Sequence, residues 1–366
     1  MRTRLRPEAF GEVSSSRGRD REARRRIVVA EARVPFVRDG AELHVQSLIE
    51  QLRMRGYDAE SIALPFHGSK TGLLDQACAW RMLNLSASNA RPIDVLIATR
   101  YPTWFARHPH KVVWLIHQHR AAYELFGTSY SDFTDSERDT ELRNRIAELD
   151  SRMFAECRRV LANSRNTATR VARFNGVTAQ PLYHPPPLAG RLRDGAYGDY
   201  VLVVARLEPL KRVDLVIRAL AKTSSPVRLV IVGDGSRRRE LEQETAALKL
   251  SDRVRFEGAI WGNPVADLYA GALGVVYAPF DEDYGYVTLE AFLAAKPVIT
   301  THDAGGPLEF VRDTTNGFVC DPNPAAIGAA IDRLAADRAL AERLGRAGQN
   351  VAHTITWDGV IEQLLG

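Results

Sequence analysis

Short apolar runs alternate along the chain with longer segments in which apolar residues recur at helical spacing. The β-branched run 27–30 is typical of a buried parallel strand, and the apolar residues of 43–52 follow it at helical spacing as far as Gly56. The pattern repeats and predicts strands at 61–64, 94–99, 111–117 and 160–163, with helices at 136–158 and 166–174. Strands that alternate with helices favour a parallel sheet with crossover helices.

A second series of the same kind follows a break in the pattern. The three prolines at 185–187 and a glycine-containing loop at 188–199 interrupt the alternation, so we expect a linker between two domains there. From Tyr200 onward the pattern predicts strands at 200–206, 227–232, 253–257, 273–278, 297–301 and 317–320, and helices at 212–222, 236–249, 264–272, 286–295, 307–312, 324–335 and 338–353. The predicted fold class is α/β, with two Rossmann-like, doubly wound domains whose carboxyl strand ends face a central cleft.

Composition is that of an ordinary globular protein. The chain has 366 residues, of which 45% are hydrophobic and 26% charged, which is enough for two buried cores. Its three cysteines are far apart and lack metal-ligand spacing, which indicates a reducing compartment. No apolar run approaches the roughly 18 residues that a membrane span requires, and no apolar stretch follows the first basic residues as in a secretory signal. We therefore expect a cytoplasmic protein.

The excess of positive charge is concentrated at the start of the chain. Residues 1–26 contain nine arginines against four acidic residues, with a serine run and glycines between them. This composition predicts a disordered basic arm at 1–25. The arm is interpreted either as a solvated tail or as a contact for anionic lipid headgroups, which would place the protein peripherally at the inner face of a membrane. Aromatic stacking platforms do not recur along it, so we expect no nucleic-acid partner.

The strongest candidate site spans 278–290, where a strand turns into a helix. Glu282 lies in the loop at the carboxyl end of the strand, and Glu290 lies in the helix that follows. Gly285 permits a close backbone approach, and the amides of Tyr286 and Val287 are expected at the helix N-terminus, which favours a phosphate. A carboxylate just before that helix suits a sugar hydroxyl instead. The alternative is that both glutamates only cap or solvate the helix.

Two basic residues flank the first turn of the second series. Arg206 and Lys211 are five positions apart, and such a pair can clamp a diphosphate, the guanidinium as a fork and the ammonium as a point charge. The alternative is a solvated basic turn. Three further residues end or follow predicted strands: Gly233 would border a nucleotide base, Gly40 would let backbone amides meet a phosphate, and His117 would face the cleft. Each of the three also has a purely structural interpretation.

These motifs together resemble the family-4 glycosyltransferases. The resemblance covers the chain from Arg26 onward and is most specific across 200–320, where the Arg206/Lys211 turn and the Glu282/Glu290 pair occur in the expected order. Residues 163–167 are similar to the family's turn from the last first-domain strand into a helix, and residues 356–358 to the start of its final helix.

The resemblance implies a fold, an activity and a role for each site residue. It implies the GT-B fold, with an acceptor domain at 26–190, a nucleotide-sugar domain at 191–353 and a final helix at 354–366 that packs back on the first domain. Arg206 and Lys211 would bind the donor diphosphate, with Gly40 nearby. Glu282 and His117 would act at the transferred sugar, and Glu290 would bind the ribose.

The implied reaction is sugar transfer that retains the anomeric configuration. The donor would be a UDP-, GDP- or ADP-linked sugar acting as co-substrate, and the acceptor a glycan, a lipid-linked or a small molecule. No cofactor and no metal are implied. Two positions depart from the family pattern: Asp39 and Gly40 replace its paired glycines, and Tyr284 replaces a frequent phenylalanine.

Other functions remain as alternatives. A Rossmann dehydrogenase would need a Gly-x-Gly-x-x-Gly turn after the first strand of a half, and neither half contains one. A nucleotide-sugar epimerase of GT-B fold shares the cleft, and product analysis without acceptor separates it from a transferase. Residues 281–283 also fit the Asp-x-Asp pattern of Mg-dependent transferases. A non-catalytic nucleotide-sugar binding protein would show no turnover.

Overall fold

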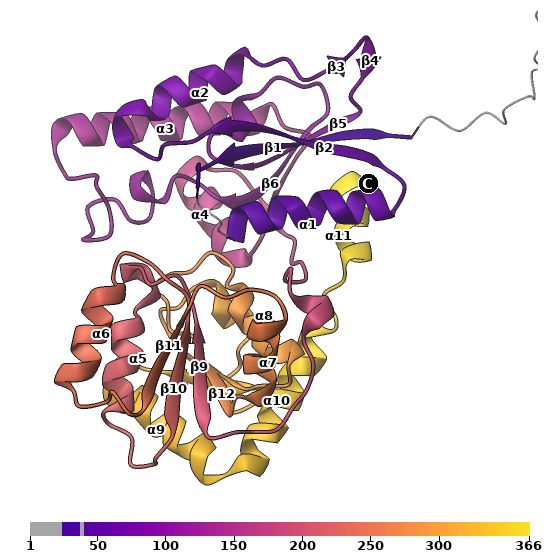
Figure 1. The fold of residues 1–366 in the computed structure, drawn as a ribbon. Helices are drawn as coiled ribbons and strands as arrows, with labels where there is room; N and C mark the ends of the chain where they lie inside the picture. The colour runs from indigo at the N-terminus through magenta and orange to yellow at the C-terminus, as the bar shows by residue number, and fades with distance from the viewer. Residues whose placement is uncertain (1–23, 37–39) are drawn as a thin grey trace, which may run out of the picture.

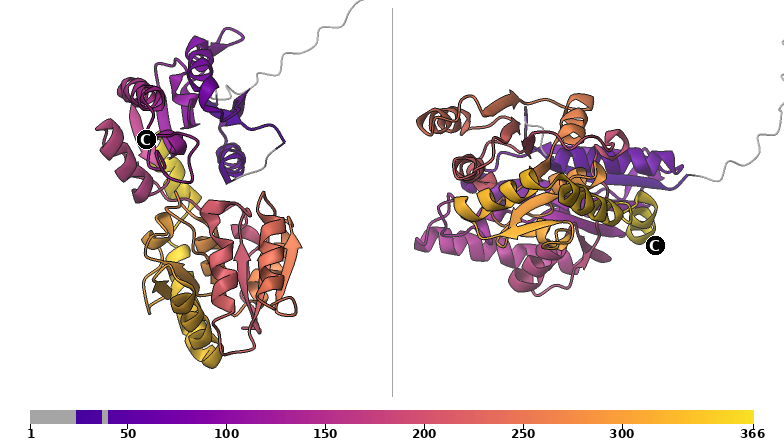
Figure 2. Two further views of the ribbon diagram at one scale, coloured as in Figure 1. Left: turned by 90° about the vertical axis from the view of Figure 1, so that its left-hand side faces the viewer. Right: turned by 90° about the horizontal axis from the view of Figure 1, so that it is seen from below.

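The computed structural model describes residues 24–36 and 40–366. It contains two α/β domains, each built around a six-stranded parallel sheet, and the domains are stacked one on the other (Figure 1, Figure 2). The predicted α/β fold class with two Rossmann-like domains is therefore confirmed. The basic arm predicted at 1–25 lies outside the described residues except for Arg24 and Arg25. Within the described ranges, none of the helices combines the length and the apolarity needed to cross a bilayer.

The first sheet has the strand order β2-β1-β5-β6-β7-β8, and every neighbouring pair is parallel. Its strands are β1 (Arg26–Arg33), β2 (Asp58–Pro65), β5 (Val95–Arg100), β6 (Lys111–His117), β7 (Arg159–Ala162) and β8 (Gln180–Pro181). Its helices are α1 (Gly40–Met54), α2 (Leu73–Met82), α3 (Glu137–Ala155) and α4 (Arg165–Asn175). A short antiparallel pair, β3 (Ala87–Ser88) and β4 (Arg91–Pro92), precedes β5.

The second sheet has the order β11-β10-β9-β12-β13-β14, again parallel throughout. Its strands are β9 (Tyr200–Val204), β10 (Arg228–Val232), β11 (Val254–Gly258), β12 (Gly274–Val276), β13 (Val298–Thr301) and β14 (Gly317–Cys320). Its helices are α5 (Val213–Leu220), α6 (Arg238–Ala247), α7 (Asn263–Gly271), α8 (Tyr286–Leu293), α9 (Pro324–Ala336) and α10 (Arg338–Ala352). The strand order reverses direction beside β9, and in such sheets ligands bind at that point.

One predicted helix is shorter than expected. The segment predicted as a helix at 307–312 forms only a 3₁₀ turn, η6 (Gly306–Glu309). The amide of Arg312 donates to the side chain of Asn316 (2.7 Å) instead of continuing a helical ladder. This local bond turns the chain toward β14 and ends the helical geometry.

Side chains at the helix starts explain where several helices begin. In each case a Ser, Thr, Asn or Asp oxygen accepts a backbone N–H of the first turn, which would otherwise have no partner. The capping residues are Ser136 for α3, Ser164 for α4, Asn323 for α9, Asp337 for α10 and Thr356 for the last helix, α11 (Trp357–Leu365). At the other end of α4, Gly176 adopts a left-handed conformation with φ 65°.

The inner strands of each sheet are buried on both faces, as their apolar runs predicted. In β9, Val201 and Val203 pack into one core, and Leu202 packs into the core on the opposite face. The helix α11 buries Val360 and Leu364 in the core of the first domain, below α1 (Figure 1). The last residues of the chain therefore belong to the first domain in space.

The chain passes between the domains twice, and the two passages meet. The first follows β8 and includes His184, and the second precedes α11 and ends at Trp357. The rings of these two residues have centroids 6.0 Å apart. The buried ring of Trp114 lies against both, 5.0 Å from His184 and 6.3 Å from Trp357.

Candidate functional site

The loop that follows β12 forms the centre of the candidate site. It spans residues 278–285, and the amides of Asp281 and Glu282 donate to the carbonyls of Asp303 (2.9 Å) and Ala304 (2.8 Å). Asp281 has φ 44°, in the left-handed region that non-glycine residues seldom adopt. The loop is thus held in a conformation that it would not favour alone.

Two glycines of the facing turn make room for this loop. A Cβ atom on Gly305 would lie 2.6 Å from the carbonyl oxygen of Glu282, and one on Gly306 would lie 2.6 Å from that of Asp283. No side chain fits at such distances. These glycines therefore fix how closely the carboxylate-bearing loop approaches the rest of the second domain.

Glu282 forms an ion pair with Lys211, and its Oε2 also accepts a hydrogen bond from the hydroxyl of Tyr277 (3.0 Å). Both charged side chains are mostly buried, with 14% of Glu282 and 16% of Lys211 exposed. Burial opposes ionisation of the carboxyl, but the ammonium of Lys211 holds the pKa of Glu282 below its ordinary value. The structure thus joins directly two residues that the sequence only placed in the same domain.

Arg212 fixes the turn that carries Lys211. It follows the 3₁₀ turn η5 (Pro209–Lys211) with φ 48°. Its guanidinium donates to the carbonyls of Ala278 (2.9 Å) and Pro279 (2.7 Å) and pairs with Asp303 (2.7 Å). Lys211 and the Glu282 loop are therefore tied to one another through the backbone as well as through the ion pair.

Glu290 has a different environment from Glu282. Its Oε2 accepts a hydrogen bond from the hydroxyl of Tyr269 (2.7 Å). Burial raises the pKa of Glu290 to about 7, and the Tyr269 hydrogen bond opposes this only in part. One of the two glutamates is thus held as a carboxylate, and the other titrates near neutrality.

The start of α8 meets the first domain at Gly40. Gly285 precedes the helix with φ 82°, and a Cβ there would lie 2.9 Å from the ring of Tyr277. The ring of Tyr286 lies 3.5 Å from the position that a Cβ on Gly40 would take, and Val287 is buried behind it. The two helix starts that were predicted to face a phosphate, α1 and α8, therefore lie against each other across the domain junction.

The three remaining predicted site residues form no hydrogen bond or ion pair with the Lys211–Glu282 pair in the part of the chain that the structure describes. Arg206 is exposed and has no side-chain partner among residues 24–36 and 40–366. His117 ends β6, and its Nδ1 donates to the carbonyl of Gln118 (2.6 Å). Gly233 has a structural explanation: its φ is 134°, its amide donates to Gly258 (2.8 Å), and a Cβ would lie 1.8 Å from the carbonyl of Ala205. Its place at the end of β10 does not require a ligand.

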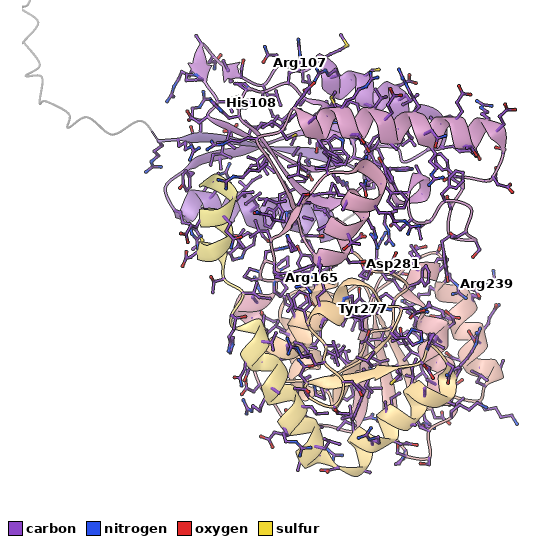
Figure 3. The ribbon with its side chains drawn as sticks, turned by 180° about the vertical axis from the view of Figure 1, so that it is seen from behind. Arg107, His108, Arg165, Arg239, Tyr277 and Asp281 are labelled. Atoms are coloured by element: carbon purple, nitrogen blue, oxygen red, sulfur yellow. The ribbon has the colours of Figure 1, made fainter. Side chains whose placement is uncertain are left out.

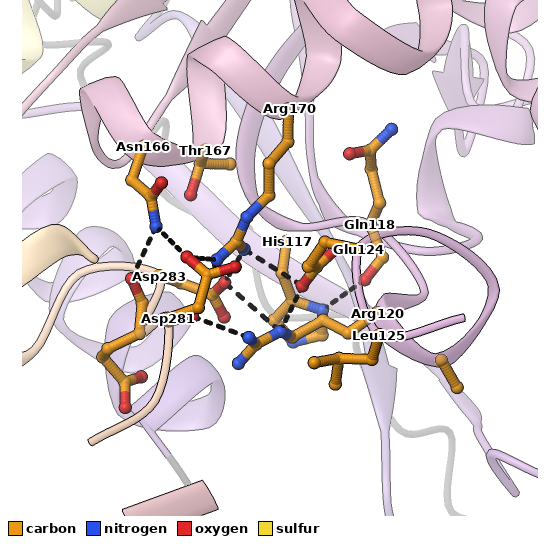
Figure 4. Close-up of polar contacts among 12 residues, drawn as sticks. His117, Gln118, Arg120, Glu124, Leu125, Asn166, Thr167, Arg170, Asp281 and Asp283 are labelled. Carbon is orange, nitrogen blue, oxygen red and sulfur yellow. Dashed lines mark hydrogen bonds and ion pairs between the residues drawn. The ribbon is translucent and has the colours of Figure 1, made fainter. Parts of the chain in front are cut away.

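Four residues of the site were not predicted as such. Asp281 lies at the junction of the two domains (Figure 3). Arg120 and Arg170 of the first domain reach across to Asp281 and Asp283, close to His117 (Figure 4). Asp283 was noted only as part of an Asp-x-Asp pattern, and Asn166 only as part of a turn. An isolated arginine carries no sequence signal of its own, so Arg120 and Arg170 could not be found without the fold.

The Asp-x-Asp pattern has arginine partners in the structure. Arg170 pairs with Asp281 (2.7 Å) and with Asp283, and Arg120 Nε lies 3.6 Å from Asp283. Although burial opposes ionisation, the two guanidinium groups hold the pKa of Asp283 at about 2. Across the described part of the chain, no cluster of three or more His, Cys, Asp or Glu side chains has a metal-binding arrangement.

The second domain, which carries the loop and the Lys211–Glu282 pair, is similar in sequence to a known family. Residues 197–351 match the model of the family described as glycosyl transferases group 1. The match covers almost the whole second domain and ends within α10.

Several glycosyltransferases are similar in sequence. An uncharacterized glycosyltransferase of Methanocaldococcus jannaschii is 32% identical over 45% of this chain and 43% of that protein. D-inositol 3-phosphate glycosyltransferase of Salinispora tropica is 33% identical over 46% of this chain and 37% of its own length. The protein of that name from Salinispora arenicola is 27% identical over 94% and 84% of the two chains. The first two of these alignments span less than half of the relatives' length.

Solved structures resemble the chain along almost its full length. HepE of Anabaena, in complex with UDP and glucose, has a TM-score of 0.68 at 18% identity and covers 92% of this chain and 97% of its own. Sucrose-phosphate synthase of Thermosynechococcus elongatus has a TM-score of 0.73 at 18% identity, with the same coverage. At this level of identity the similarity establishes the fold, which is GT-B.

Proposed function

We propose that this protein is a retaining glycosyltransferase that moves a sugar from a nucleotide-sugar donor to a glycan, a lipid-linked or a small-molecule acceptor. The observation that carries the proposal is the buried Lys211–Glu282 pair, which lies in the loops at the carboxyl ends of β9 and β12. The similarity of residues 197–351 to group 1 glycosyl transferases supports the same reaction class.

In this proposal the donor diphosphate takes the place of Glu282 as the partner of Lys211. Arg206, exposed at the end of β9, supplies a guanidinium fork for the same group. The start of α8 adds the partial positive charge of a helix N-terminus, with Gly40 facing it from the first domain. As the diphosphate leaves, these groups neutralise its growing negative charge.

The carboxylate of Glu282 acts on the transferred sugar. Once Lys211 has turned to the diphosphate, the carboxylate is able to accept hydrogen bonds from the sugar hydroxyls. It also stabilises the positive charge that develops on the ring when the bond to the diphosphate breaks. An interaction that strengthens in the transition state raises turnover rather than affinity alone. His117, at the end of β6, faces the same sugar from the first domain. The acceptor hydroxyl attacks on the face that the diphosphate leaves and gives its proton to the departing diphosphate oxygen.

Glu290 binds the nucleoside. Its carboxyl group lies in α8, the helix that follows the loop. Tyr269 donates a hydrogen bond to its Oε2, and its Oε1 accepts a hydrogen bond from a ribose hydroxyl. HepE of Anabaena has been solved with UDP-glucose, so UDP-linked donors are tested first, followed by GDP- and ADP-linked ones. The proposal includes no metal, since cationic side chains and helix amides neutralise the diphosphate.

The test measures release of the nucleoside diphosphate from each donor, with and without EDTA, for the wild type and for Glu282→Gln. We expect one donor to be cleaved or transferred, no loss of rate in EDTA, and almost no rate in the variant. Nuclear magnetic resonance of the product should show the anomeric configuration of the donor. Loss of all activity in EDTA with recovery in Mg²⁺ or Mn²⁺ would reject the metal-free mechanism. The absence of turnover with every donor would reject the proposed transferase activity.

A further inference from the structure

The loop of residues 281–283 belongs to the second domain, but the first domain provides most of its side-chain contacts. Arg120, in the 3₁₀ turn η3 (Arg120–Ala122), and Arg170 of α4 both donate through Nη2 to the carbonyl of Asp281, at 2.6 and 2.7 Å (Figure 4). Asn166, also of α4, donates to the side chain of Asp281 and to the carbonyl of Glu282, each at 2.9 Å.

These contacts form a buried group of opposite charges. Arg170 pairs with Asp283 and lies 3.2 Å from Glu124, and Arg120 also pairs with Glu124. The side chains of Arg170 and Glu124 are each 7% exposed, and that of Asp283 is 10% exposed. Removing one partner from such a group leaves an uncompensated buried charge, so the geometry of the whole group depends on each member.

These contacts influence the position of Glu282 through the backbone of Asp281, the residue that precedes it. Asp281 has φ 44°, and a non-glycine residue stays in that region only when its surroundings hold it there. The two guanidinium groups on its carbonyl and the amide of Asn166 provide that hold from the other domain. The side chain of Glu282 leaves the same turn toward Lys211.

We propose that Arg170 and Arg120 are positioning residues, which aim Glu282 at the transferred sugar only while the two domains are in contact. The inference rests on the glycosyltransferase function proposed above. It couples the spacing of the domains to the geometry of the carboxylate: when the first domain moves away, the loop loses the contacts that hold its turn.

The chain offers a control for the interface itself. Glu309 of the second domain accepts the amides of Arg165 and Asn166 at 2.8 Å each and the hydroxyl of Tyr183 at 2.6 Å. Its side chain joins the domains beside α4, and among the described residues it forms no hydrogen bond or ion pair with residues 281–283. Arg173, exposed on α4 over the ring of Phe174, controls for the loss of an arginine from that helix.

The experiment compares Arg170→Gln, Glu309→Gln and Arg173→Gln in steady-state transfer and in calorimetric binding of the nucleoside diphosphate. For Arg170→Gln we expect kcat to fall by about 10²-fold, the loss that a small misplacement of a reacting group causes, while KM for the donor and the diphosphate affinity change little. Glu309→Gln should reduce kcat much less, and Arg173→Gln should not change it.

A second measurement tests the loop without turnover. In hydrogen exchange, the amide of Glu282, which donates to Ala304, should exchange faster in Arg170→Gln and at the wild-type rate in Glu309→Gln. If Arg170→Gln fails to fold, Asn166→Ala removes contacts to the same loop without exposing a buried charge and should lower kcat in the same way. An unchanged kcat, or equal losses in Arg170→Gln and Glu309→Gln, would overturn the positioning role. A wild type without transfer would instead overturn the proposed function and leave the exchange result standing.

Discussion

Replacing Glu290 with glutamine should stabilise the protein above about pH 7 and leave its stability below pH 4.5 almost unchanged. The change keeps the size of the side chain, and the amide oxygen of glutamine is able to accept the hydrogen bond from Tyr269. The substitution removes a carboxyl group whose ionised form is disfavoured by burial, and with it the free-energy cost of ionisation in the folded protein.

The size of the effect follows from the pKa of Glu290, which burial raises from 4.5 to about 7. A carboxyl with a raised pKa binds its proton more tightly in the folded than in the unfolded chain. Its contribution to stability is therefore present below pH 4.5, is lost as the pH rises to about 7, and remains lost above that. At 1.36 kcal/mol for each unit, the loss in the wild type is on the order of 3 kcal/mol.

The assay is denaturant unfolding of both proteins at a series of pH values, with the difference between their stabilities as the result. Asp150 of α3 is also buried, with a pKa raised to about 7, but it titrates in both proteins and cancels in the difference. The difference should rise between about pH 4.5 and 7 in favour of the glutamine variant and stay constant above that. If the unfolding free energies of the two proteins change in parallel with pH, Glu290 does not titrate in this range, and the reasoning is refuted.

Three further predictions concern the donor and the arm. Glu282→Gln should lower turnover by about 10²–10³-fold, which is the effect of losing one preorganised charge, and calorimetry should show unchanged affinity for the bare nucleoside diphosphate. Lost affinity with intact turnover would contradict the assigned role. Lys211→Ala should weaken nucleoside diphosphate binding by roughly 1.5–3 kcal/mol, as loss of a charge-assisted contact does, and equal calorimetric affinities would assign the lysine to structure alone. Deletion of residues 1–24 should keep turnover on a soluble acceptor but reduce salt-sensitive binding to anionic vesicles in a sedimentation assay, and a truncated protein that no longer folds would show that the arm is structural.

The sequence predicted most of the fold because the inner strands of both sheets are buried on both faces. Runs such as 27–30 and 201–204 are uniformly apolar, and that pattern depends little on which strand lies beside which. The helix α2 was not predicted, since only Leu73, Ala77 and Trp80 are buried and the small Ala77 weakens the apolar stripe. The 3₁₀ turn η6 was predicted as a helix because the Asn316 bond that ends it comes from a residue beyond the segment.

The candidate site was predictable only where its residues lie close together in the sequence. Glu282, Glu290 and Gly285 share one strand-to-helix turn, whose chemistry is visible locally. The contacts of Arg120 and Arg170 with that turn join segments more than a hundred residues apart, for example 113 residues between Arg170 and Asp283. No spacing rule connects such segments, so only the packing of the two domains identifies the partners.

The meeting of the two interdomain passages has a mechanical consequence. His184 and Trp357 lie side by side against Trp114, so the covalent connections between the domains are gathered at one point rather than spread along the junction. Two chains that cross at one point act as a single pivot, and displacement on rotation grows with distance from it. The contact between Tyr130 and Phe280, stacked with centroids 5.4 Å apart, includes neither passage and has no covalent tether beside it. Two labels, one near Tyr130 and the other near Phe280, should therefore report a larger distance change on domain rotation than two labels placed across the pivot.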